Sequence, residues 1–340
     1  MKNGNVAVIG ASGYTGQECI KLIQRHRGVS LRYVVGNQSA GQNLNAIRPA
    51  FPSLPILPFP EVPWSQVDLA LTCLPHGPAE GESMQTVAAL RAQGVKVIDL
   101  SGDYRLQTPA TYQTWYGHAH QHETLLKQAV YGLAEWNRTQ IRQADLVANP
   151  GCYPTACLLA LLPLVRHGLL AESIIIDAKS GMSGAGRSAK IGNLFSEMAD
   201  NVRPYGAGRS HRHVGEIDLV LGQYGFSSGI TCFTPQVVPL HRGMLCNLYL
   251  KTRKDLNAQA WQEVFQETYA NEPFVKVLPI GQFAEIKSAV ETNLCVLSLH
   301  PIPDGVLIMS AIDNLTKGAA GQAIQNMNLM LGFDEQEGLL

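Results

Sequence analysis

Apolar and polar positions along the first 150 residues follow two patterns, short apolar runs and apolar residues at helical spacing. Residues 6–9 form a short apolar run that ends at Gly10, which is typical of a buried strand. Residues 15–27 then place apolar side chains at helical spacing. The same patterns predict further strands at 31–35, 68–73, 95–100 and 145–148, and a helix at 78–93. Strands that alternate with helices predict βαβ units and a mostly parallel sheet.

The pattern changes after residue 150, where strands dominate. Candidate strands lie at 173–179, 229–239, 244–251, 274–278, 294–300 and 306–312. Because few helical patterns separate them, we expect a second domain with a mostly antiparallel or mixed sheet and one face free for a partner. A helical pattern returns at 316–331. Residues 49–63 contain six prolines, which predicts an extended surface loop.

Composition narrows the class of protein. The chain has 340 residues, enough for two ordinary domains, and 46% hydrophobic against 16% charged residues excludes intrinsic disorder. Lys and Arg (26) nearly balance Asp and Glu (27), which gives no support to nucleic-acid or membrane-surface binding. The longest apolar run, 156–165, is too short to span a bilayer, and the first residues do not resemble a signal peptide. Seven scattered cysteines are typical of reduced thiols, so we expect a cytoplasmic protein.

A glycine-rich turn lies between the first strand and the first helix. Its sequence, Gly-Ala-Ser-Gly-Tyr-Thr-Gly, is a GxxGxxG variant of the dinucleotide-binding fingerprint. Backbone N–H groups at a helix N-terminus receive a pyrophosphate, whereas a bare tight turn is the simpler alternative. The strand before it and the helix after it favour dinucleotide binding. The expected cofactor contacts are Gly10, Ser12, Gly13, Tyr14, Thr15 and Gly16.

The second strand bears on the choice between NAD and NADP. An enzyme that reads the ribose hydroxyl of NAD usually places an acidic residue at the end of this strand. No acidic residue occurs between Glu18 and Glu61, and Asn37, Gln38 and Ser39 stand there instead. These side chains donate hydrogen bonds to a 2′-phosphate, which a carboxylate would repel. We therefore expect NADP, held partly by Asn37 and Ser39.

Two further loops follow predicted strands of the parallel sheet. Ligands in such sheets lie at the carboxyl ends of the strands, so Pro75 and His76 are expected beside the cofactor and Ser101 and Arg105 beside the substrate. A catalytic role for His76 is the less favoured alternative.

The segment Asn-Pro-Gly-Cys-Tyr-Pro-Thr around Cys152 is the most informative of the chain. A strand ends at residue 148 and a helical pattern begins near Thr155, so Cys152 lies close to a helix N-terminus, where the dipole favours a thiolate. We interpret Cys152 as a nucleophile, with inert packing as the alternative, and Asn149 as a substrate contact. Cys157, among leucines, is interpreted as a core residue.

A thiolate that performs acyl chemistry needs a proton partner. His211, His213 and Glu216 precede an apolar helical pattern, and His213 and Glu216 are three residues apart, so the carboxylate can orient and charge the imidazole. His213 is favoured over His211 as the acid/base, and both stay candidates. A zinc site that includes Cys157 is disfavoured, because these spacings fit no usual structural site. No metal is expected.

A second glycine-rich segment, 179–187, follows a predicted strand. Its glycines permit close backbone contact with a ligand, and Arg187 offers charge to an anionic substrate. A flexible interdomain turn is the alternative. Arg105, Arg187 and Arg209 are the candidate phosphate or carboxylate contacts. The substrate contacts expected in the segment itself are Ser180, Gly181 and Arg187.

Several motifs together resemble one family, N-acetyl-γ-glutamyl-phosphate reductase. They are GASGYTG, NPGCYPTACLLALLP, KSGMSGAGR, SHRHVGEI and DNLTKGAAGQAIQNMN, spread in order from residue 7 to about 330. The resemblance implies a Rossmann-type, doubly wound NADP-binding domain from residues 1–150 and 313–340. It also implies a central α+β domain, 151–312, for substrate binding and oligomerisation.

The resemblance also implies residue roles and a reaction. Cys152 is the expected nucleophile and His213 the acid/base, with Ser183 and Gly184 by the cofactor and Asn314 near the nicotinamide. The implied reaction is an NADPH-dependent reductive dephosphorylation through a cysteine thioester in arginine biosynthesis, by a homodimer or homotetramer. The alternatives are an aspartate-semialdehyde dehydrogenase, a non-catalytic NADP-sensing regulator and a thiol hydrolase.

Overall fold

The chain divides into two compact units. The computed structural model describes residues 4–187, 190–254 and 256–340. The first unit runs to Pro150 and is completed by Ala319–Leu340, and the second comprises Gly151–Gly318. The chain thus returns to the first unit at Ala319, six residues later than the sequence-based boundary at 313.

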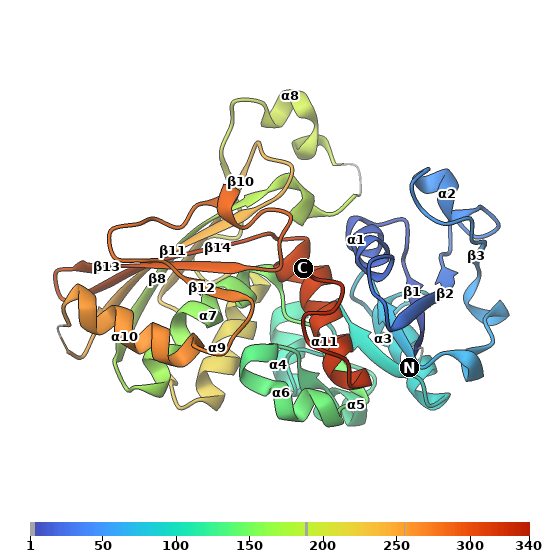
Figure 1. Ribbon diagram of the computed structural model, residues 1–340, viewed down its shortest axis with the longest axis horizontal. Helices are drawn as coiled ribbons and strands as arrows, with labels where there is room; N and C mark the ends of the chain where they lie inside the picture. The colour runs from blue at the N-terminus through green and yellow to red at the C-terminus, as the bar shows by residue number, and fades with distance from the viewer. Residues whose placement is uncertain (1–3, 188–189, 255) are drawn as a thin grey trace. The chain divides into compact units, whose positions relative to one another are not determined.

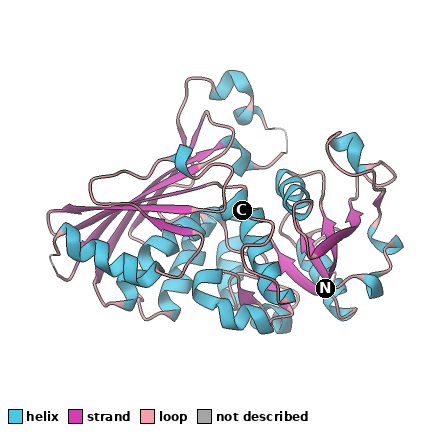
Figure 2. Cartoon of the chain, viewed as in Figure 1, coloured by secondary structure: helices cyan, strands magenta, loops and turns pink. Residues whose placement is uncertain are grey.

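The first unit is built on a seven-stranded sheet in the order β3-β2-β1-β4-β5-β7-β6. Every pair of neighbours in it is parallel, as the alternation of strands and helices predicts (Figure 2). Its strands are β1 (Gly4–Ile9), β2 (Val29–Val35), β3 (Ile56–Leu57), β4 (Leu69–Thr72), β5 (Lys96–Asp99), β6 (Val130–Tyr131) and β7 (Leu146–Ala148).

The connections run in opposite directions from the middle of this sheet. The crossover from β1 through α1 (Tyr14–Ile23) leads to β2, and that from β4 through α3 (Ser83–Ala92) leads away to β5. Right-handed crossovers in opposite directions place their helices on opposite faces, so the sheet is doubly wound with its switch point between β1 and β4. The other helices of this part are α2 (Leu44–Ile47), α4 (Pro109–Tyr116), α5 (Glu123–Gln128) and α6 (Ala134–Gln143).

Two local predictions in the first unit are only partly right. The helix expected at 78–93 begins at Ser83, because turn-forming residues with positive φ, Gly77 (143°) and Gly81 (81°), precede it. The proline-rich segment 49–63 is not wholly a surface loop. It contributes the edge strand β3, where missing N–H donors are tolerated, and buries Ile56 and Val62.

The second unit is built on a mixed sheet, as predicted, and its strand order is β12-β13-β14-β11-β8-β10-β9. Antiparallel pairs dominate, and β8 pairs with β10, and β12 with β13, in parallel. The strands are β8 (Leu170–Gly181), β9 (Arg203–Pro204), β10 (Cys232–Val238), β11 (Met244–Thr252), β12 (Val275–Val277), β13 (Cys295–Ile302) and β14 (Gly305–Ile312).

Helices cover one face of this mixed sheet (Figure 1). They are α7 (Cys152–Arg166), α9 (Arg212–Gln223) and α10 (Ala258–Tyr269), while α8 (Phe195–Met198) lies in the excursion between β8 and β9. Residues of β11 alternate between buried and more exposed, the signature of a sheet with one face packed on helices. On the other face Ile175 and Tyr249, paired across β8 and β11, are each 42% exposed.

The C-terminal helical pattern appears as a π-helical turn, Thr316–Ala320, followed by α11 (Gly321–Leu331). Helix α11 packs against α1 and α6 of the first unit and buries Ala323, Ile324 and Met327 completely. No helix in the described part of the chain is both long and apolar enough to cross a membrane.

Candidate functional site

The glycine-rich turn follows β1 at the switch point of the parallel sheet. Gly10 has φ of +85°, and a Cβ there would overlap the backbone carbonyl oxygen of Cys73, which follows β4. A Cβ on Gly16 would overlap the carbonyl oxygen of Gly10. Helix α1 begins at Tyr14, so its first N–H groups lie at the carboxyl end of the sheet. This geometry fits a bound pyrophosphate.

The other expected cofactor contacts of the first unit differ in exposure. Ser12, Gly13, Tyr14 and Thr15 are half-buried. Beyond β2, Asn37 is exposed, whereas Ser39 is buried with its hydroxyl against the space where Gly36 would carry a Cβ. Asn37 is therefore the more available group for a 2′-phosphate.

The loop after β4 carries Pro75 and His76. Pro75 is exposed, and the ring of His76 meets that of Tyr116 edge to face at 5.2 Å. The backbone N–H of Gly77 donates to Asp103 at 3.1 Å, which connects this loop to the loop after β5.

Three expected substrate contacts, Ser101, Arg105 and Asn149, are buried in the first unit. Ser101 donates to Asp99 (2.6 Å), and Arg105 donates from Nε to the carbonyl oxygen of Asn149 (2.8 Å). Asn149 donates to the carbonyl oxygen of Ala319 (3.1 Å). These bonds give all three side chains a structural role, and their contact with substrate stays a prediction.

Asp103 was not singled out by its sequence. Its side chain is fully buried and accepts hydrogen bonds from Gly77 N–H and from the hydroxyl of Tyr112 (2.6 Å). Burial, followed by the nearby charge of Asp99, raises the pKa of the Asp103 carboxyl to about 7. The available signal was a pair of acidic residues four apart, the first of them at the end of a buried strand.

Cys152 is the first residue of α7, and Gly151 is the N-cap. The helix begins three residues earlier than the position near Thr155 expected from sequence. The thiol therefore lies in the first helical turn, where the dipole favours a thiolate. Cys157, in contrast, is fully buried in the same helix.

Both histidines lie at the start of α9, and the rings of His211 and His213 are 4.8 Å apart. His211 is the N-cap, and its Nδ1 accepts from the backbone N–H of His213 (3.1 Å). Burial, followed by the charge of Arg212, lowers the pKa of His211 to about 4. A neutral capping imidazole is poorly suited to carry a proton at neutral pH, which favours His213 as the acid/base.

An aromatic ring joins the histidines to the cysteine segment. Tyr153, directly after Cys152, is buried, and its ring lies 5.8 Å from that of His211 and 5.9 Å from that of His213. Its hydroxyl is 3.2 Å from that of Tyr205. Burial, with the tyrosine neighbour next, raises the pKa of Tyr153. Sequence reasoning missed Tyr153, although it stands beside the nucleophile.

Glu216 contacts the cysteine segment from α9. It is only 1% exposed, and its Oε1 accepts from the backbone N–H of Gly151 at 2.8 Å. Glu216 and His213 both lie in the N-terminal half of α9, as their spacing predicts. The structure therefore packs the start of α9, with both histidines and Glu216, against the residues that flank Cys152 at the start of α7.

The second glycine-rich segment is held by hydrogen bonds rather than free. Strand β8 ends at Gly181, and the N–H groups of residues 181–183 donate to the carbonyl oxygens of residues 243, 240 and 241. A Cβ on Gly181 would lie 2.9 Å from backbone atoms of Arg242. Such bonding argues against a flexible turn over 181–183. Gly184 and Arg187 are exposed, whereas Ser180 is buried.

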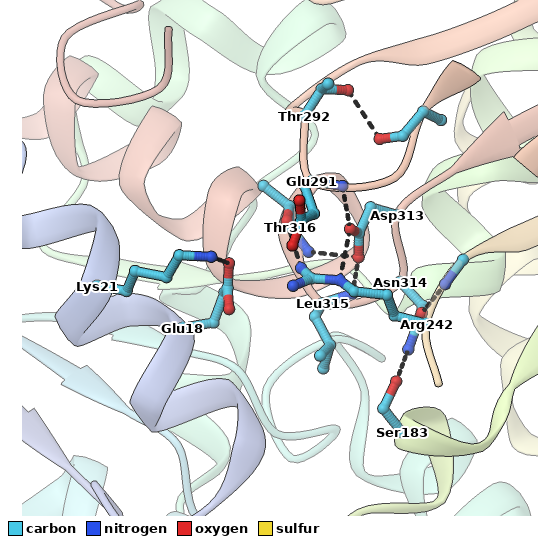
Figure 3. A network of polar contacts seen from close by, with 12 residues as sticks. Glu18, Lys21, Ser183, Arg242, Glu291, Thr292, Asp313, Asn314, Leu315 and Thr316 are labelled. Carbon is cyan, nitrogen blue, oxygen red and sulfur yellow. Dashed lines mark hydrogen bonds and ion pairs between the residues drawn. The ribbon is translucent and has the colours of Figure 1, made fainter. Parts of the chain in front are cut away.

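Asn314 connects the glycine-rich segment to the loop after β10. Its Nδ2 donates to the hydroxyl of Ser183 (2.9 Å), and its Oδ1 accepts from Gly243 N–H (2.7 Å), as Figure 3 shows. These bonds use both ends of the amide, and a contact of Asn314 with the nicotinamide stays a prediction.

A buried ion pair that the sequence did not reveal lies next to Asn314. Arg242 Nε is 2.7 Å from Asp313 Oδ2, and Asp313 also accepts from the backbone N–H groups of Glu291, Leu315 and Thr316 (Figure 3). Asp313 is fully buried, so these partners satisfy a charge that burial alone would penalise.

Arg209 is engaged on the outside of the second unit. It forms an ion pair with Asp218 (2.6 Å) and donates to the carbonyl oxygen of Ile230. A substrate contact of Arg209 therefore stays a prediction. Within the described residues, no group of three His, Cys, Asp or Glu side chains gathers as a metal site would.

Two family models match this chain in succession. Residues 5–144 match the model described as "Semialdehyde dehydrogenase, NAD binding domain". Residues 152–314 match "Semialdehyde dehydrogenase, dimerisation domain". A nicotinamide-dinucleotide domain and an oligomerisation domain thus follow each other as the two units do.

Curated relatives match along nearly the whole chain. Proteins named N-acetyl-gamma-glutamyl-phosphate reductase from Halothermothrix orenii and Rhodospirillum rubrum are each 43% identical and cover 98% of this chain and 97% of their own. A probable chloroplastic reductase of the same name from Arabidopsis thaliana is 41% identical and covers 100% of this chain and 84% of its own.

Solved structures with this fold are more distant. Aspartate semialdehyde dehydrogenase II from Vibrio cholerae superimposes with a TM-score of 0.75 at 20% identity, over 97% of this chain and 99% of that one. The enzyme with NADP from Candida albicans has a TM-score of 0.70 at 14% identity, over 97% and 99%. These show the fold alone, whereas the relatives show more: the chain belongs to the N-acetyl-γ-glutamyl-phosphate reductase family of semialdehyde dehydrogenases.

Proposed function

We propose that the protein reduces N-acetyl-γ-glutamyl phosphate with NADPH to N-acetylglutamate semialdehyde and inorganic phosphate, as a step of arginine biosynthesis in the cytoplasm. The observation that carries the proposal is Cys152 as the first residue of α7, followed by a tyrosine in ring contact with His213. A thiol at a helix N-terminus suits nucleophilic attack on an acyl group. Relatives named for this reaction, at 41–43% identity, support the substrate.

The chemistry divides into acylation and reduction. The Cys152 thiolate attacks the acyl carbon, and the bond from that carbon to the phosphate oxygen breaks. Inorganic phosphate departs, and the acyl group remains on the sulfur as a thioester. A nicotinamide held at this site would supply the hydride that reduces the thioester. His213 protonates the developing oxyanion and takes the proton back as the C–S bond breaks, which releases the semialdehyde and restores the thiolate.

Glu216 orients and charges the His213 imidazole in this proposal. Its burial and its spacing of three residues from His213 on α9 support that role, because residues three apart lie on one face of a helix. His211 supports the same helix start as its cap.

The cofactor is proposed to be NADP(H), held by residues of the first unit and of the glycine-rich segment. The turn from Gly10 to Gly16 would receive the pyrophosphate, and Asn37 and Ser39 the 2′-phosphate. The absence of acidic residues between Glu18 and Glu61 supports NADP over NAD. Pro75, His76, Ser183, Gly184 and Asn314 would complete the site.

The substrate is proposed to contact Ser101, Arg105, Asn149, Ser180, Gly181, Arg187 and Arg209. Arg187 is exposed and carries a guanidinium, which suits contact with an anionic group of the substrate. The enzyme is proposed to act as a homodimer or homotetramer, which the dimerisation-domain match supports.

Assays of the reverse reaction test the proposal. The purified protein, inorganic phosphate and NADP⁺ or NAD⁺ are combined with N-acetylglutamate semialdehyde or with aspartate semialdehyde. We expect the acetylated aldehyde and NADP⁺ to be used with the higher kcat/KM, and the variant Cys152→Ser to be inactive. A clear preference for aspartate semialdehyde, or turnover without Cys152, would overturn the proposal. NADP binding with no turnover of either aldehyde would indicate a sensor instead.

A further inference from the structure

The peptide before Cys152 is fixed by a side chain from another helix. Glu216 of α9 accepts from Gly151 N–H, which holds the N-cap of α7. The first turns of α7 are also tied to the sheet, because the hydroxyl of Ser310 on β14 donates to the carbonyl oxygen of Ala156 (2.8 Å). These two hydrogen bonds therefore restrict movement of the start of α7, which carries Cys152.

The Cys152 side chain lies against a glycine of the turn Thr316–Ala320, which follows β14. A Cβ built on Gly318 would lie 2.8 Å from the Cβ of Cys152 and 3.2 Å from Cδ1 of Ile312. Real Cβ atoms essentially never approach another atom so closely, so the backbone at position 318 lies directly against the Cβ of Cys152. Any side chain at 318 would displace either the turn or Cys152.

The turn that contains Gly318 is π-helical. Gly318 N–H donates to the carbonyl oxygen of Asp313 (2.9 Å), five residues earlier. π-Helical turns are rare and are found frequently at functional sites. Here the wide turn brings the backbone of Gly318 against Cys152.

The turn is held from several sides. The Asp313 carboxylate accepts from the N–H groups of Leu315 and Thr316 and pairs with Arg242, which also donates to the Thr316 hydroxyl (2.9 Å). The buried ammonium of Lys317 lies 5.6 Å from the centre of the Phe274 ring. Because the turn is held in this way, a side chain at position 318 would displace Cys152 rather than the turn.

We propose that Gly318 is a positioning residue for the nucleophile: its missing side chain leaves the space in which Cys152 adopts its reactive orientation, and the π-helical turn fixes that space. The inference rests on the proposed role of Cys152. It goes beyond that role by assigning a function to a residue with no reactive group.

The test compares Gly318→Ala with Gly222→Ala. Gly222 lies in α9, and a Cβ there meets nothing within 4 Å, so its replacement should preserve activity. For Gly318→Ala we expect kcat to fall by about 10²-fold, the cost of a displacement of about 1 Å at a reacting group. The KM values should change little, and alkylation of Cys152 by iodoacetamide should change in rate and in pH midpoint. A merely destabilising change would lower Tm but leave these properties of the folded enzyme intact.

A double-mutant cycle measures the contact itself, without any assay of activity. In Cys152→Gly the Cβ that would clash is absent, so Gly318→Ala should lower Tm less in this background than in the wild-type protein, by about 2 °C or more. Equal Tm losses in the two backgrounds, or a Gly318→Ala enzyme with full kcat and unchanged alkylation, would overturn the inference. Failure of the proposed function would show differently, as catalysis by Cys152→Ser.

Discussion

At the scale of single residues, position on a helix separates the roles of similar side chains. Cys152 and Cys157 share α7, but only Cys152 lies in its first turn, and Cys157 is fully buried. His211 and His213 share α9, but His211 caps the helix as a neutral acceptor. The sequence indicated the cysteine assignment. It left the histidines open, because capping depends on the residue at which the helix begins.

The histidines are predicted to respond differently to replacement. His213→Gln removes the group proposed to carry the proton, so kcat should fall by about 10² to 10⁴-fold. His211→Asn retains a capping side chain, so kcat should change far less. Steady-state kinetics of both variants, with thermal unfolding as a check on folding, measure the contrast. A larger loss in His211→Asn at unchanged Tm would reverse the assignment.

Asp103 predicts a pH dependence of stability in the neutral range. Its pKa is raised from 3.8 to about 7 in the folded protein, so between these values the folded state holds a proton that the unfolded state has lost. The stabilisation of the folded state by this proton is complete below pH 3.8 and is lost as the pH rises to about 7. Over that range the free energy of unfolding falls by up to about 1.4 kcal/mol per pH unit. Asp103→Asn should lack this slope.

Urea unfolding at pH 5, 6, 7 and 8 measures the difference for Asp103. The free energy of unfolding of the wild-type protein, relative to Asp103→Asn, should decline over this series. Parallel curves for the two proteins would show that the buried carboxyl does not titrate there.

At the scale of elements, α11 completes the first unit from the far end of the chain. Asn326 is fully buried and donates to the carbonyl oxygen of Gly132 (2.8 Å) and to Asn149 Oδ1 (3.0 Å). The periodicity of the sequence predicted a helix in this segment. The residues that Asn326 bonds to could not be predicted from the sequence, because they lie 177 or more positions away along the chain.

Replacement of Asn326 tests how α11 is held. Asn326→Ala removes the donor to Asn149 Oδ1 and one of the two side-chain donors to the Gly132 carbonyl oxygen, the other being Gln322, so the free energy of unfolding should fall by about 1–3 kcal/mol. Because Asn149 lies three residues before Cys152, kcat should also fall. Urea unfolding and kinetics measure the two effects, and a variant with wild-type stability would contradict the structural role of this amide.

At the scale of the whole molecule, the mixed sheet of the second unit has an apolar pair on the face opposite its helices. Ile175 and Tyr249 face each other across β8 and β11, and each is 42% exposed. Exposed apolar pairs on an open sheet are suited to contact with a second copy of the chain. The strand-rich sequence predicted that one face of the sheet is free, and the register of the strands shows which residues lie on that face.

The oligomer is predicted to depend on this face. Tyr249→Glu places a charge among apolar neighbours and should shift the protein toward monomers. Tyr224→Glu, at an exposed tyrosine at the end of α9, is the matched control and should leave the mass unchanged. Light scattering coupled to size-exclusion chromatography measures both, and an unaltered mass for Tyr249→Glu would exclude this face as the interface.

The sequence by itself determined the strands other than the two-residue β3, β6 and β9, the glycine turn, the mixed sheet and the thiol at a helix start, because these follow from local periodicity and from residues with special backbone freedom. The helix start at Ser83, the buried part of the proline-rich segment, the Asp313–Arg242 pair and the contact of Gly318 with Cys152 were decided by the tertiary structure. The physical reason is distance along the chain. Burial, pKa shifts and close approaches arise between residues that periodicity within a short window does not relate.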